Sequence, residues 1–225
     1  MEQFLRSKFK VKDFEAIGPG AGQELSFLNR TVRFWSSVGL EVQPDPRLID
    51  LTAEELELTT AKPVAAPGVK DGGPAVSTGD DALVRPEREL YARAVGRVLY
   101  ISLDRYDIQY VARLLTRVLS YSSKLDLHRL RHLVKFLLGT KDWAWVFAWQ
   151  TEEEVAQLRG QSDSDCAQDK HTRRSVSSGF LARGRHVLET RTKGQQLIAL
   201  SSGEAEFYAA GSAAARLLYH VYLLR

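Results

Sequence analysis

The sequence contains little cysteine and no long apolar run, and both absences limit what the chain can be. Cys166 is the only cysteine among 225 residues, so no intrachain disulfide can form and zinc sites built on several cysteines are excluded. No stretch of about 18 apolar residues occurs, so nothing is expected to span a bilayer. The N-terminus, MEQFLRSKFKVKD, lacks the apolar region of a secretory signal. We therefore expect an intracellular protein, cytoplasmic or nuclear, without a membrane partner.

The residues that are present are ordinary for a globular protein, except in how their charges are distributed. Hydrophobic residues make up 44% of the chain and charged residues 26%, and the length suffices for one or two domains with their own cores. The formal net charge is +3, but residues 85–142 carry 12 Lys and Arg against 6 Asp and Glu. This basic middle hints at a polyanionic partner, and an ordinary solvated helix surface explains it about as well.

Hydrophobic patterns and turn residues divide the first part of the chain. Apolar residues alternate through 32–42, which is the period of a half-buried hairpin. Thr52 and Glu55 form a capping-box pattern and predict the start of a short helix. Residues 63–86 hold four of the seven prolines and a cluster of glycines, which is typical of a linker.

The segment after this linker, residues 87–149, is predicted to be mainly helical. Apolar residues follow a 3.6-residue period through 108–119 and again through 127–137. Gly139 stands where a C-terminal helix cap belongs. A short loop near residues 120–124 would make these two helices an antiparallel pair.

Basic side chains on the second of these helices are the candidates for nucleic-acid binding. Arg129, Arg131 and Lys135 are expected to point mostly away from its apolar stripe. Such side chains bind phosphate groups in a salt-dependent manner. The alternative is a solvated helix surface, and the residues alone leave both interpretations open.

Residues 150–225 have a different pattern again. SVSSGFLARG and HVLETRTKGQQLIAL carry small and β-branched residues between glycines, which predicts strands. Ser201 and Glu204 form a second capping box, followed by a helix that runs to the end of the chain. We expect three antiparallel strands with this helix packed on one face, and hence an α+β protein.

Carboxylates gather in two places of this last part. Asp163, Asp165 and Asp169 lie within seven residues, and Glu204 and Glu206 open the C-terminal helix. An acid on a strand and an acid on the first turn of a helix above the sheet can converge, and Mg²⁺ prefers such oxygen ligands. Two such ions support phosphodiester cleavage. Acids at a helix N-terminus also stabilise the helix dipole, so spacing alone is a weak signal.

These motifs resemble the ribonuclease H segment of copia-type retrotransposon polyproteins. SDSDCAQDKHTRRSVSSGF and QQLIALSSGEAEFYAA match the family's Ser-Asp-Ala-Asp-Trp-Ala-Gly-Asp, Arg-Arg/Lys-Ser-Thr-Ser-Gly and Ala-Leu-Ser-Ser-x-Glu-Ala-Glu-Tyr motifs in order. Upstream, LYARAVGRVLYISLDRYDIQYVARLLTRVLS and HRLRHLVKFLLGTKD are similar to the helical connection between polymerase and nuclease. FKVKDF, ELSFLNRTVRF and AKPVAAP are similar to the end of the reverse transcriptase region. The resemblance covers nearly the whole chain.

The resemblance implies a division into four parts. Residues 1–62 would be the end of a reverse transcriptase palm and thumb, 63–86 a linker, 87–149 the helical connection, and 150–225 a truncated ribonuclease H-like domain. The last part would be a three-stranded sheet with a C-terminal helix. The implied partners are an RNA–DNA hybrid and the rest of the Pol polyprotein.

The resemblance also distinguishes the acidic residues at catalytic positions from the acidic residues at other positions. By position, Asp163 matches the family's first metal-binding aspartate and Glu206 its metal-binding glutamate, so these two are the expected catalytic residues and Mg²⁺ ligands. Asp165, Asp169 and Glu204 match positions without a catalytic role.

Several positions depart from the family pattern. Cys166 and Arg191 stand where the family has Trp, Gln168 where it has Gly, and Tyr106 where Pro is usual. The polymerase motif, an aromatic-x-Asp-Asp, is absent from the sequence, and two further nuclease aspartates would by family order lie beyond Arg225. The resemblance therefore implies a polyprotein fragment that is inactive alone and binds Mg²⁺ weakly or not at all. The alternative is a non-catalytic nucleic-acid-binding remnant that uses the basic helices.

Overall fold

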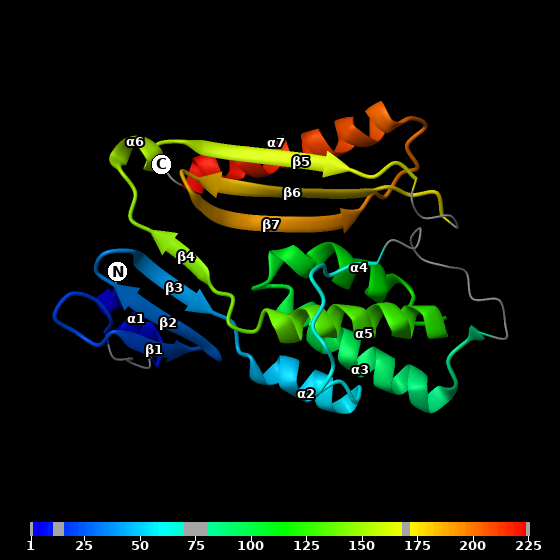
Figure 1. Ribbon diagram of the computed structural model, residues 1–225. Helices are drawn as coiled ribbons and strands as arrows, with labels where there is room; N and C mark the ends of the chain where they lie inside the picture. The colour runs from blue at the N-terminus through cyan, green and yellow to red at the C-terminus, as the bar shows by residue number, and fades with distance from the viewer. Residues whose placement is uncertain (1, 11–15, 70–80, 168–171, 224–225) are drawn as a thin grey trace.

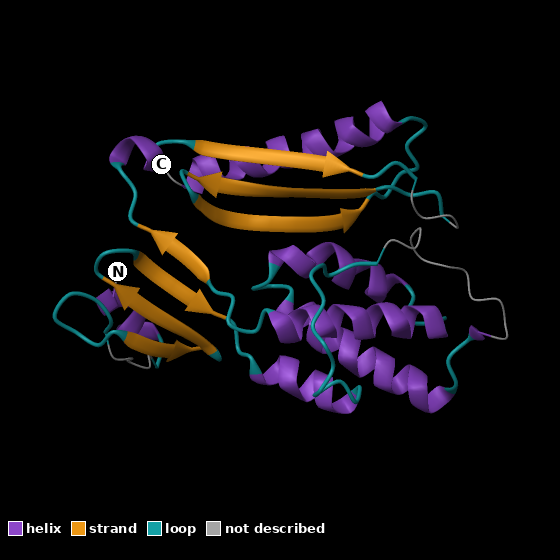
Figure 2. Ribbon diagram, in the orientation of Figure 1, coloured by secondary structure: helices purple, strands orange, loops and turns teal. Residues whose placement is uncertain are grey.

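The computed structural model describes residues 2–10, 16–69, 81–167 and 172–223. In these ranges the chain forms an N-terminal sheet, a helical bundle and a C-terminal sheet with a long helix (Figure 1). Figure 2 shows the helical bundle beside the N-terminal sheet, with the C-terminal sheet lying along both. The expected α+β class is confirmed. None of the described helices is long and apolar enough to cross a membrane.

The N-terminal sheet is antiparallel, with the strand order β1-β2-β3-β4. Its strands are β1 (Glu24–Phe27), β2 (Arg30–Trp35), β3 (Gly39–Gln43) and β4 (Trp145–Ala148), and α1 (Glu2–Lys8) precedes them. β2 and β3 confirm the hairpin predicted for 32–42. β4 was missed, because it lies inside the segment predicted to be helical and its four residues are too few to show a period.

The middle of the chain is a bundle of helices around the main hydrophobic core. Its elements are α2 (Arg47–Glu55), α3 (Arg85–Ile101), the 3-10 helix η2 (Tyr106–Ile108), α4 (Gln109–Arg117) and α5 (Lys124–Gly139). The ring of Tyr91 is fully buried in this core, and its hydroxyl donates to the Leu115 carbonyl at 2.9 Å. This burial raises the pKa of Tyr91. α5 packs against α4 and ends at Gly139, and its cap is Thr140, one residue beyond the predicted position.

One helix start was predicted wrongly. Thr52 and Glu55 were expected to begin a helix, but α2 begins at Arg47 and ends at Glu55. The hydroxyl of buried Thr52 donates to the Leu48 carbonyl, four residues earlier, at 2.7 Å. A threonine hydroxyl can make this bond inside a helix as readily as it caps a new one, so the capping pattern was ambiguous.

Elements from distant parts of the sequence share the same layers. α2 comes before the proline-rich segment, yet it packs on α3 and α5 after it. Arg97 of α3 binds the Glu55 carboxylate through two hydrogen bonds of 2.8 Å. β4 follows the bundle and pairs with β3. The N-terminal sheet and the bundle are therefore connected twice, once where the chain runs from β3 to α2 and once where it runs from α5 to β4.

The C-terminal sheet is antiparallel, with the order β5-β6-β7. Its elements are β5 (Leu158–Ser164), β6 (Val176–Arg183), β7 (His186–Gly194) and α7 (Ser202–Leu223), preceded by the short α6 (Glu152–Val155). α7 packs on β5 and β6, which confirms the predicted three strands and helix. β7 also contacts the bundle, where Gln109 of α4 donates to the Thr190 hydroxyl at 2.8 Å.

The core beneath α7 is thin. The hydrophobic residues buried in this part of the described chain are mostly small: Val176, Leu181, Ala182, Ala199, Ala205 and Ala209. In the middle of its sheet-facing side α7 presents the small residues Ala209, Ser212 and Ala213, while Leu217 packs over Gly160 nearer its end. The two layers consequently enclose a hollow rather than a filled core.

Candidate functional site

The two expected metal ligands come from adjacent elements at one edge of the C-terminal sheet. Asp163 lies near the end of β5, and Glu206 lies in the first turns of α7. The Glu206 Oε1 accepts a hydrogen bond from the backbone N–H of Ser164 at 3.2 Å. The fold thus brings Glu206 beside the residue that follows Asp163, the kind of convergence that a strand and an overlying helix allow.

This hydrogen bond lies on the unpaired edge of β5. The Asp165 N–H donates to the Val176 carbonyl at 3.0 Å, so it points toward β6. Backbone N–H groups alternate between the two sides of an antiparallel strand, so the Ser164 N–H points away from β6. Edge N–H groups need a partner, and the Glu206 carboxylate supplies one. Glu206 therefore stabilises the sheet edge in addition to any chemistry.

The carboxylates of Asp163 and Glu206 approach this edge from different sides. Gly160 faces α7, because a Cβ there would lie 2.8 Å from a Leu217 methyl group. Ser162, two residues on, lines the hollow below α7. Since successive side chains alternate, Asp163 points to the opposite face. Both acids are exposed, so a bound divalent ion would keep most of its water ligands.

The described ranges contribute no third ligand to this pair. Within them, no group of three or more His, Cys, Asp and Glu side chains is placed to hold a metal ion. Two carboxylates are suitable donors for Mg²⁺, but a site for two ions needs more of them.

Asp165 maintains the local fold beside this site. Its Oδ1 accepts the Val176 N–H at 2.6 Å, which secures the chain where β5 leads toward β6. The next residue, Cys166, is exposed. Asp169 and Gln168, which the sequence analysis also named, lie outside the described residues.

Glu204 acts as the predicted cap of α7. Its carboxylate accepts the Leu200 N–H at 2.7 Å, and its own N–H donates to the Ser201 hydroxyl at 3.1 Å. The Tyr208 hydroxyl donates to Glu204 at 2.6 Å. This bond first, and the Leu200 N–H second, hold the pKa of Glu204 below its ordinary value.

The three basic residues proposed to contact phosphates differ in their surroundings. Arg131 is exposed and Lys135 is half-buried on α5. Arg129 lies mostly buried, and its Nη1 donates at 3.0 Å to Asp126, whose side chain is 2% exposed. Arg129 thus neutralises a buried carboxylate next to the Ser123 cap of α5. The Asp–Arg spacing of three residues on a helix was the sequence signal for this pair.

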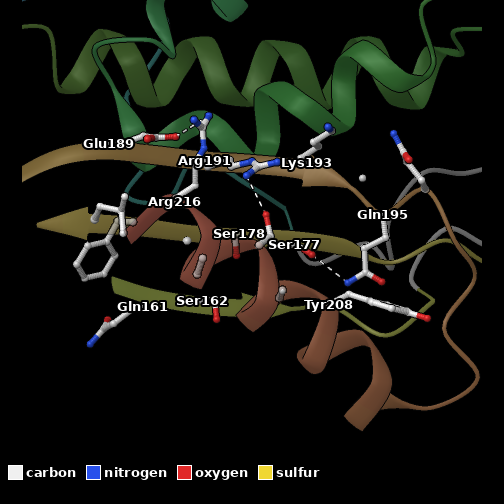
Figure 3. A pocket seen from close by; sticks show the side chains of 18 of the residues that line it. Gln161, Ser162, Ser177, Ser178, Glu189, Arg191, Lys193, Gln195, Tyr208 and Arg216 are labelled. Carbon is white, nitrogen blue, oxygen red and sulfur yellow. Dashed lines mark hydrogen bonds and ion pairs between the residues drawn. The ribbon is translucent and has the colours of Figure 1, made fainter. Parts of the chain in front are cut away.

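A charged row on β7 was missed by the sequence analysis. Glu189, Arg191 and Lys193 alternate along the strand, so all three share the face toward α7 (Figure 3). Arg216 of α7 pairs with Glu189 at 3.2 Å. The alternation is visible in HVLETRTKG, but the sequence does not say that this face meets α7.

The chain is similar to several curated proteins. It is 26% identical over 98% of its length to "Retrovirus-related Pol polyprotein from transposon RE1" of Arabidopsis thaliana. It is 24% identical over 98% of its length to the transposon RE2 polyprotein of the same organism. It spans 14% of each of these polyproteins. A 124-residue stretch, 55% of the chain, is 30% identical to "Secreted RxLR effector protein 161" of Plasmopara viticola and covers 85% of that protein. No family model and no solved structure matches the chain.

Proposed function

Because the chain belongs to the retrovirus-related Pol polyproteins of transposons, we propose that it is a segment of a copia-type polyprotein. It comprises the end of a reverse transcriptase-like region, a helical connection and the front half of a ribonuclease H-like domain. Its relatives of this type would act on RNA–DNA hybrids, whereas this segment is inactive alone. The observation that carries the proposal is the placement of Glu206 against Ser164, next to Asp163.

The roles of the two acids follow from their positions. Asp163 and Glu206 would hold Mg²⁺, which supplies an activated water and stabilises the leaving oxygen when a complete site is formed. Glu206 is anchored through the Ser164 N–H, so its carboxylate has a defined direction. With two carboxylates, the charge of a second ion stays uncompensated, and the two ions repel each other.

We expect the chain to bind Mn²⁺ weakly at this edge. Paramagnetic Mn²⁺ should broaden the amide signals of Ser164 and Glu206 before those of the helical bundle, and Asp163→Asn should abolish the selective broadening. Glu204→Gln is the matched control, because that acid caps α7 and should leave the broadening at Ser164 unchanged. Uniform broadening, or selective broadening that survives Asp163→Asn, would argue against the metal site.

We also expect no cleavage of the RNA strand of an RNA–DNA hybrid, with Mg²⁺ or with Mn²⁺. The assay compares the unchanged chain with Asp163→Asn on a labelled hybrid, beside an active hybrid ribonuclease as positive control. Turnover by the unchanged chain that disappears in Asp163→Asn would show that other groups complete the site, and the proposed inactivity would be wrong.

A second candidate function is non-catalytic binding of nucleic acid by the basic helices. The observation that favours it is the excess of 12 basic over 6 acidic residues in 85–142, together with the exposure of Arg131 on α5. Lys135 follows one turn later on the same helix. Arg129 contributes less, because it already pairs with Asp126.

For this function we expect weak, salt-dependent binding to an RNA–DNA hybrid. Each phosphate contact contributes about 0.9 to the slope of log affinity against log salt. Charge reversal at both Arg131 and Lys135 should therefore lower the slope by about 1.8 in a fluorescence-anisotropy titration. Lys62→Glu, an exposed change before the bundle, is the control. An unchanged slope in the double variant would favour the solvated-surface interpretation.

A further inference from the structure

The hollow between the C-terminal sheet and α7 has a volume of about 270 Å³ (Figure 3). Its walls are formed by β5, β6, β7 and one face of α7, and neither Asp163 nor Glu206 lines it. Gly179 adds no side chain to the floor, and Ala209 and Ala213 add little from the helix. An apolar cavity of about 150 Å³ takes up benzene, so this hollow has room for two fused rings.

A cation without a counter-ion in the described part of the chain reaches into this hollow. Arg191 extends from β7 toward α7, and its Nη1 donates to the Ser212 hydroxyl at 2.9 Å. Within the described ranges, neither Arg191 nor Lys193 pairs with a carboxylate, since the nearby Glu189 pairs with Arg216 at 3.2 Å. Arg191 is partly buried, so water screens its charge less than it would screen that of a fully exposed arginine. The hollow therefore favours an anion beside Arg191.

We propose that this hollow binds a small organic anion. The ligand has an apolar, ring-containing body of at most two fused rings, and one carboxylate, sulfonate or phosphate group that meets Arg191 and Lys193. A mainly apolar pocket with a few convergent polar groups is the usual form of a small-molecule site. This site is independent of Asp163 and Glu206.

The test uses the full chain and three matched probes. 2-Naphthoate and naphthalene-2-sulfonate carry an anionic group, and 2-naphthamide lacks the charge. In calorimetric titrations we expect one site for each of the two anions with a dissociation constant below about 1 mM. The amide should bind about tenfold more weakly, because charge-assisted hydrogen bonds are roughly twice as strong as neutral ones.

Two variants and one control connect the binding to the hollow. Arg191→Gln keeps a donor for Ser212 but removes the charge, so it should erase the preference for the acid over the amide. Arg191→Trp should fill the space and abolish binding of all three probes, with circular dichroism checking that the fold is kept. Arg113→Gln, an exposed change on α4, should have no effect. Absent binding, equal affinity for acid and amide, or an unchanged preference in Arg191→Gln would overturn the proposal.

Discussion

Replacing Arg105 by alanine is expected to lower the free energy of unfolding by about 3–5 kcal/mol. The side chain is 5% exposed and donates to the Thr140 carbonyl at 2.8 Å and to the Thr140 hydroxyl at 2.7 Å. It also binds the Asp107 carboxylate through bonds of 2.9 and 2.7 Å. Its guanidinium carbon lies 5.2 Å from the Trp143 ring centre and 5.8 Å from that of Phe136.

The expected loss is large because several groups depend on Arg105 together. It joins the start of η2 to the end of α5, and its removal would leave Asp107 without its counter-ion and buried Thr140 with fewer partners. Arg105→Lys should lower the free energy of unfolding by an intermediate amount, because lysine keeps the positive charge but lacks the planar guanidinium group.

The measurement is urea denaturation followed by tryptophan fluorescence, with far-ultraviolet circular dichroism as a second probe of two-state behaviour. Arg113→Ala is the matched control, since this exposed arginine should change stability by no more than about 0.5 kcal/mol. If Arg105→Ala were as stable as this control, the network would contribute nothing measurable.

Gly39→Ala is expected to break the pairing of β3 with β4 and to cost at least about 3 kcal/mol. Gly39 has φ +137°, and a Cβ there would lie 2.0 Å from the Phe147 carbonyl oxygen and 2.9 Å from its carbon. Neither atom can move by side-chain rotation, because both belong to the backbone of the paired strand. The clash can be relieved only if β4 moves away from β3, because Gly39 pairs with Ala148 of β4.

Gly96→Ala is the contrasting control for this variant. Gly96 is exposed in the middle of α3, and an added Cβ would meet nothing within 4 Å. An alanine in a helix interior is more stable than a glycine by about 0.5–1 kcal/mol, so this variant should gain stability. Denaturation curves would then move in opposite directions for two changes of the same chemistry. A Gly39→Ala chain as stable as the original would mean that β4 is not held by β3.

Local patterns in the sequence were sufficient for several elements. The alternation through 32–42 predicted the hairpin of β2 and β3, and the glycine-bounded β-branched segments predicted β6 and β7. The capping box at Ser201 and Glu204 predicted the start of α7. These signals arise from residues two to four positions apart, so they can be recognised without knowledge of the tertiary contacts.

The two errors have different causes, one local and one that depends on a distant strand. Thr52 satisfied a capping pattern, but in the fold its hydroxyl binds the Leu48 carbonyl inside α2. β4 was too short to show any period, and its place is decided by the register with β3. A four-residue strand gains its stability from its partner strand, which lies far away in the sequence.

The sequence by itself determined the α+β class and most elements, and its resemblance to a family singled out Asp163 and Glu206 as the acids to test. Only the tertiary structure showed that Glu206 accepts a hydrogen bond from the Ser164 N–H at a sheet edge. It also showed that Arg129 forms an ion pair with Asp126. It also placed Arg191 in a hollow without a counter-ion in the described chain. The physical reason is that helix and strand periods depend on neighbours along the chain. Burial, ion pairing and the presence of a cavity depend on which faces of distant elements meet.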